Sequence, residues 1–147
     1  MQVVRDPAEL GEVLNLLHGR WFSSHDVVVA PRAGALIVSL ARRASEEPPF
    51  LDRNLGPLFR RWRIPLRETI LTIRNLTDHV IEPGDWRLEA LGFENGTVSL
   101  FAGEAPVVRA TVSDLRLEVR ETPRVVGERI ESCTLGFIRR YAIRRTT

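Results

Sequence analysis

Residues 86–101 read WRLEALGFENGTVSLF, and this stretch decides the fold. Apolar and polar residues alternate on both sides of the central pair Asn95-Gly96. An Asn-Gly pair between two alternating runs is typical of a type I′ turn, because both central residues of that turn need a positive φ. The stretch therefore predicts a β-hairpin, which is a pair of antiparallel strands.

The same period of two recurs along most of the chain after residue 26. Within the segment 62–76, the apolar residues change parity near 67–69, which predicts a bulge, because one extra residue swaps the faces of a strand. Clusters of turn-forming residues separate the alternating runs. The expected strands are 26–30, 34–42, 62–76, 86–90, 97–101, 107–120 and 136–144.

Two segments have helical spacing instead. In segment 6–19, Asp6 suits the N-cap and Pro7 the first helical position, and apolar residues follow at intervals of three and four. In the tail, apolar residues from Val126 to Cys133 have a similar interval, which predicts a short helix near 125–132.

The elements together predict a mainly β protein of the α+β class. We expect an antiparallel β-sandwich or an open barrel, with one N-terminal helix and a short C-terminal helix. A chain of 147 residues favours one globular domain over residues 1–147. Segment 44–60 contains Pro48-Pro49 and further turn residues, so we expect a long loop there, whose apolar residues cover an open end of the sheet or bind a second copy.

The composition excludes several classes of chemistry. All 21 basic residues are arginine, so Schiff-base lysines and Walker A lysines are excluded. Cys133 is the only cysteine, which excludes an internal disulfide and a multi-thiolate zinc site. We therefore expect no cofactor, no metal site and no catalytic residue of these kinds.

The cellular compartment is also an expectation from the sequence. No apolar run approaches about 18 residues, the length that suggests a membrane-spanning helix. The first residues, MQVVRD, lack a basic stretch followed by an apolar one. We therefore expect a cytoplasmic protein with no membrane partner.

Charge is distributed unevenly along the chain, and two basic segments contain aromatic residues. One interpretation is an anion-binding or single-stranded nucleic-acid-binding surface with stacking platforms. The interpretation we favour is pairing of the arginines with acidic residues on neighbouring strands, because a net charge of +2 is small for a protein that tracks phosphates. The candidate binding residues are Arg60, Arg61, Trp62, Arg63, Arg139, Arg140, Tyr141 and Arg144.

Two His/Asp pairs carry a weaker hypothesis. His25-Asp26 and Asp78-His79 would form an acid–base site if they met in space. No sequence motif requires that meeting, and Ser23-Ser24-His25-Asp26 is typical of a polar turn.

The sequence thus favours a small non-catalytic binding or interaction module that self-associates into a homo-oligomer. One alternative is binding of single-stranded nucleic acid or another anion through the arginine and aromatic clusters. A second alternative is a hydrolase that uses the two His/Asp pairs.

Overall fold

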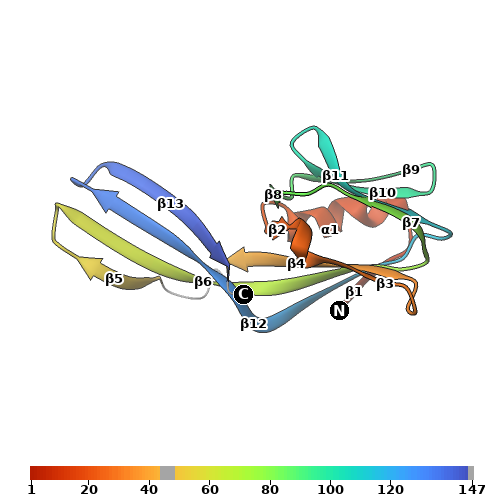
Figure 1. Ribbon diagram of the computed structural model, residues 1–147, viewed down its shortest axis with the longest axis horizontal. Helices are drawn as coiled ribbons and strands as arrows, with labels where there is room; N and C mark the ends of the chain where they lie inside the picture. The colour runs from red at the N-terminus through yellow and green to blue at the C-terminus, as the bar shows by residue number, and fades with distance from the viewer. Residues whose placement is uncertain (44–48, 146–147) are drawn as a thin grey trace. The chain divides into compact units, whose positions relative to one another are not determined.

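The computed structural model describes residues 1–43 and 49–145 (Figure 1). Strands dominate this part of the chain, and its one α-helix, α1 (Leu10–Leu17), lies near the N-terminus. The strands form two sheets that are mostly antiparallel, and neither sheet closes into a barrel. The expected mainly β, α+β class with antiparallel sheets and one N-terminal helix is therefore confirmed.

The larger sheet has nine strands and the smaller sheet has four. The central order of the larger sheet is β1-β12-β6-β4-β2-β8, with β13 on β12, β3 on β4 and β5 on β6. The order of the smaller sheet is β7-β11-β10-β9. The bounds are β1 (Gln2–Val4), β2 (Trp21–Ser23), β3 (Val27–Ala30), β4 (Ala35–Arg43), β5 (Phe50–Asn54), β6 (Phe59–Ile73), β7 (Leu76–Ile81), β8 (Asp85–Arg87), β9 (Ala90–Glu94), β10 (Thr97–Ala102), β11 (Ala105–Val112), β12 (Leu117–Thr134) and β13 (Ile138–Arg145).

The chain divides into two compact units. Unit 1 comprises Met1–Leu40 and Thr69–Glu121, and unit 2 comprises Ala41–Glu68 and Thr122–Thr147. The boundaries fall inside β4, β6 and β12 rather than in loops. This division does not test the expectation of a single domain, which stays a prediction.

Unit 1 is built around one hydrophobic core. Asp6 accepts a hydrogen bond of 3.0 Å from the N–H of Ala8, and the short 3₁₀ turn η1 (Pro7–Glu9) leads into α1. This start of the helix agrees with the expected cap at Asp6. One face of α1 is buried among side chains from both sheets, so helix and sheets share a single apolar interior. The largest fully buried side chains of this core are Phe22, Leu17, Leu36, Leu40, Leu71, Ile73, Leu88, Leu100 and Leu117.

The expected hairpin is present in the smaller sheet. Asn95 has a φ of 51° and Gly96 a φ of 74°, so both turn residues take the left-handed conformation. The two strands pair in register, with Glu94 opposite Thr97. The prediction from the Asn-Gly pair is therefore confirmed.

Unit 2 contains a four-stranded sheet in the order β5-β6-β12-β13 (Figure 1). β5 pairs with β6 and β12 pairs with β13, in both cases antiparallel. At the ends of these two hairpins, the N–H of Leu135 donates a 3.1 Å hydrogen bond to the carbonyl of Leu58. The two turns therefore lie together at one end of the sheet.

The expected C-terminal helix is wrong. Residues 125–132 belong to β12, and Gly127 to Thr134 pair with β13. The helical interval of the apolar residues did not decide the structure, because β-branched residues favour a strand, Gly127 disfavours a helix, and β12 has partners on both sides.

Three further expectations need correction. The expected loop 44–60 contains β5 and the start of β6, while 44–48 lie outside the described residues. The expected strand 107–120 is interrupted between β11 and β12, and the expected strand 86–90 is interrupted between β8 and β9. The parity change in β6 is confirmed, because the buried positions switch from even to odd between Glu68 and Thr69.

Candidate binding surface of unit 2

All eight predicted binding residues lie in unit 2. Four of them are consecutive on β6, and the other four lie on β13. β12 lies between β6 and β13 in the sheet, so one strand separates the two groups of residues. Successive residues of a strand point to opposite faces, so Trp62 and Arg63 lie on different faces of the sheet.

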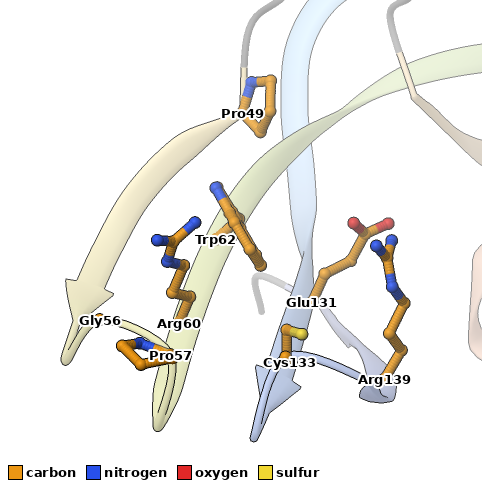
Figure 2. A pocket seen from close by; sticks show the side chains of 9 residues that line it. Pro49, Gly56, Pro57, Arg60, Trp62, Glu131, Cys133 and Arg139 are labelled. Carbon is orange, nitrogen blue, oxygen red and sulfur yellow. The ribbon is translucent and has the colours of Figure 1, made fainter.

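The face that carries Trp62 contains a hollow of about 500 Å³ (Figure 2). Arg60 and Trp62 come from β6, Glu131 and Cys133 from β12, and Arg139 from β13. Cys133 and Arg139 are directly opposite in the register of β12 and β13. The hollow therefore combines a broad aromatic surface with two guanidinium groups and one carboxylate.

A smaller hollow of about 220 Å³ shares part of this lining. Trp62, Arg139 and Arg140 line it together with Tyr141. The guanidinium carbon of Arg129 lies 4.4 Å from the centre of the Tyr141 ring, which is a cation–π distance. Arg129 is also 3.0 Å from the carboxylate of Glu131. The Tyr141 ring therefore already contacts the guanidinium group of Arg129, a neighbour within the sheet.

A third hollow, of about 560 Å³, has a different lining. It includes Phe50, Arg63, Glu128 and Arg144, and it shares no residue with the other two. Arg63 lies 3.9 Å and Arg144 3.8 Å from the carboxylate of Glu128. Here two of the predicted binding arginines are partly neutralised by an acidic side chain.

Asp52 on β5 is held by two arginines of β6. Arg61 donates a 2.7 Å hydrogen bond from its Nε, and the Nε of Arg63 lies 3.3 Å from the same carboxylate oxygen. The hydrogen bond from Arg61, together with the positive charges of Arg61 and Arg63, holds the pKa of Asp52 below its ordinary value of 3.8. Asp52 thus links β5 to β6 through ion pairs.

We expect acid to weaken this hairpin through Asp52. Because its folded pKa is depressed, Asp52 stabilises the fold above pH 3.8, and this contribution is lost as the pH falls through the lower folded value. Asp52→Asn should therefore lower the free energy of unfolding near neutral pH. The difference from the wild type should become smaller in acid. Urea unfolding followed by intrinsic tryptophan fluorescence, to which Trp21, Trp62 and Trp86 all contribute, checks this, and Arg61→Gln, which removes the other partner of the pair, should show the same pH dependence. A gap that stays constant from pH 6 to pH 2 would contradict the assignment.

Among the arginines of unit 2 whose side chains the structure describes, four have no acidic partner within 4 Å in residues 1–42 and 49–145. They lie near the ends of the two hairpins, on β5, β6 and β13. The favoured expectation of cross-strand neutralisation thus holds for Arg61, Arg63 and Arg144, whereas Arg129 pairs with Glu131 on its own strand. The four arginines without such a partner are Arg53, Arg60, Arg139 and Arg140.

The two His/Asp pairs belong to unit 1, and both aspartates make local backbone bonds. Asp26 accepts hydrogen bonds from the N–H and the hydroxyl of Ser23 at the short turn η2 (Ser24–Asp26). Asp78 accepts a 2.8 Å hydrogen bond from the N–H of His79. These bonds agree with the polar-turn interpretation, and the hydrolase alternative stays a hypothesis.

No group of three His, Cys, Asp or Glu side chains is placed to hold a metal ion in the described ranges. In the same part of the chain, no helix has the length and apolar character needed to cross a membrane.

Sequence reasoning missed several residues that line the hollows. Glu131 and Cys133 share the hollow with Trp62, and Glu128 lies between Arg63 and Arg144. These three residues lie in or next to the segment expected to be a helix, so no pairing with β6 or β13 was expected. Only the strand register brings them to the site.

Comparisons with known proteins provide no family. The chain matches no protein-family model, no curated protein and no solved structure.

Proposed function

We propose that this protein is a non-catalytic interaction module that assembles with further copies of itself. In this proposal, unit 2 of one copy contacts unit 1 of the next copy. No relative provides a function, so the proposal depends on the charges and exposed side chains of the two units.

The opposite charges of the two units carry the proposal. Unit 2 has thirteen arginines against six acidic residues, a net charge of +7. Unit 1 has eight arginines against thirteen acidic residues, a net charge of −5. Complementary potentials attract two copies and orient them so that unlike surfaces meet. Contact between like units of two copies is opposed by the same charges.

Exposed apolar side chains provide a second line of support. Among the described residues, thirteen large apolar side chains are exposed, and nine of them belong to unit 2. Unit 2 is the smaller unit, so its surface is unusually rich in apolar groups. Clusters of this kind mark contact surfaces, because burying them removes apolar area from water.

A contact between unlike surfaces has a consequence for the assembly. Such a heterologous contact leaves a free unit 1 at one end and a free unit 2 at the other. Copies then continue to add until the ends meet in a ring or the assembly grows as a filament. We therefore expect association that increases with concentration until such a ring closes, and the smallest such ring is a dimer with two identical contacts.

Reversing the charge of two arginines of unit 2, which lowers its net charge from +7 to +3, should abolish this assembly. The double variant Arg139→Glu/Arg140→Glu changes two arginines that have no acidic partner in the described ranges. We expect sedimentation velocity to show self-association of the wild type at about 50 mM salt, weaker association at about 500 mM, and monomers of the variant.

The control reverses two exposed arginines of unit 1, Arg109→Glu/Arg120→Glu, which increases the negative charge of that unit. This control should associate at least as strongly as the wild type. A wild type that stays monomeric, or a control that dissociates like the unit 2 variant, would refute the proposal.

Binding of single-stranded nucleic acid is a second candidate function, and the hollow beside Trp62 favours it. A base could stack on the indole while Arg60 and Arg139 contact phosphates. We expect a labelled oligonucleotide to bind at about 50 mM salt, more weakly at higher salt, and more weakly still to Trp62→Ala. The absence of binding at low salt would reject this candidate.

A further inference from the structure

We infer that the ends of the two hairpins of unit 2 form the apolar anchor of the contact with the second copy. We call this surface the apex, made of residues 55–58 and 135–138. The inference rests on the proposed function, because it names the part of unit 2 that enters the neighbouring unit 1.

The apex exposes more large apolar side chains than any other stretch of the described chain. The hydrogen bond from Leu135 to Leu58 holds its two turns together. Phe137 is 73% exposed, which is the largest value among the exposed aromatic side chains. The other exposed apolar side chains of the apex are Leu55, Leu58, Leu135 and Ile138.

The backbone of Leu135 takes a conformation that leucine disfavours. Leu135 has a φ of 56° and Gly136 a φ of 80°, so both residues are left-handed. Glycine and asparagine adopt this conformation readily, and a leucine side chain disfavours it. The two-residue turn between β9 and β10 has Asn95 and Gly96 in the same left-handed conformation, whereas three residues separate the last paired residues of β12 and β13. An exposed leucine in a disfavoured conformation points to a role for its side chain rather than for the turn.

The charges next to the apex select its partner. The segments 53–61 and 134–140 contain five arginines and no acidic residue. Two apices would therefore repel each other, whereas the acidic unit 1 of a second copy attracts this surface. An apolar centre surrounded by charged residues is the usual anatomy of a protein contact. The second copy's unit 1 is thus the occupant to which the charges point.

The variant Leu135→Asn distinguishes the effect of Leu135 on the turn from its effect on the contact between copies. It introduces at position 135 a residue that adopts the left-handed conformation more readily than leucine, so the thermal midpoint should stay equal or rise. The same change removes an apolar side chain from the centre of the apex. We expect the dissociation constant for self-association, measured by sedimentation, to rise at least about tenfold. Phe137→Ser should have a similar effect without involving a left-handed residue.

The control is Leu51→Asn, an exposed leucine of β5 that lies outside the apex. It should change the dissociation constant less than about twofold. If Leu135→Asn and Phe137→Ser associate like the wild type while Arg139→Glu/Arg140→Glu does not, the apex is not the anchor and the proposed function stands. If the wild type itself is monomeric, both proposals are wrong.

A lipid surface is the competing occupant, and vesicles test it. The wild type is mixed with vesicles of phosphatidylserine and phosphatidylcholine, and with vesicles of phosphatidylcholine alone. We expect no binding to either. Binding to the anionic vesicles that Leu135→Asn removes, with self-association unchanged, would overturn the second copy as the occupant.

Discussion

Phe22→Ala should lower the free energy of unfolding by about 3–5 kcal/mol, the usual cost of removing a buried aromatic side chain. Phe22 is 1% exposed and lies on β2, whose partner β8 places Trp86 directly opposite it. Its ring belongs to the core that α1 and both sheets share. Because small domains have only about 5–15 kcal/mol of stability, this variant should be close to unfolded at moderate urea.

The measurement is urea unfolding followed by far-UV circular dichroism. Phe22→Leu is the matched control, since it keeps most of the apolar volume and should lose much less stability. A loss below about 1 kcal/mol for the alanine variant would show that the core does not close around this ring.

Gly127→Ala should disrupt the pairing of β12 and β13 and destabilise unit 2 by about 1–3 kcal/mol. A Cβ atom at this position would lie 2.6 Å from the carbonyl oxygen of Arg144 and 3.2 Å from the Cα of Arg145. Both of those atoms belong to the backbone of β13, so the strand itself must move. Gly127 is therefore required for the close approach of the two strands.

Hydrogen exchange of the β12 and β13 amides measures this effect, together with the thermal midpoint. The control is Gly11→Ala in α1, where an added Cβ meets no atom within 4 Å. That variant should gain roughly 0.5–1 kcal/mol, because alanine suits a helix better than glycine. Unchanged exchange in the Gly127 variant would mean that the strands tolerate a side chain at this contact.

The sequence was sufficient to predict those features that depend only on residues close together in the chain. The Asn95-Gly96 turn, the Asp6 cap and the parity change at Glu68 each depend on a few neighbouring residues. The segment 125–132 depends instead on partners distant in the chain. Its apolar spacing fits a helix, yet β13 on one side and β6 on the other complete a sheet around it. β5 was missed for a related reason, because the register shift between Leu51 and Arg53 breaks its alternation.

The candidate surface could be predicted only in part. Arginines and aromatic residues at 60–63 and 139–144 are evident in the sequence, and the structure assigns both groups to unit 2. Which arginines are neutralised depends on the position of Asp52 and Glu128, and these follow from strand pairing. The exposed leucine at 135 could not be recognised either, because its left-handed backbone has meaning only once the turn is known.

The boundaries between the two units fall within continuous strands, and this has a consequence for how such a protein can vary. Residues inserted or deleted two at a time in β6 and β12 would preserve the face that every later side chain takes. Matched insertions of two residues in β6 and β12 would lengthen the basic sheet in steps of about 7 Å, twice the rise of one residue.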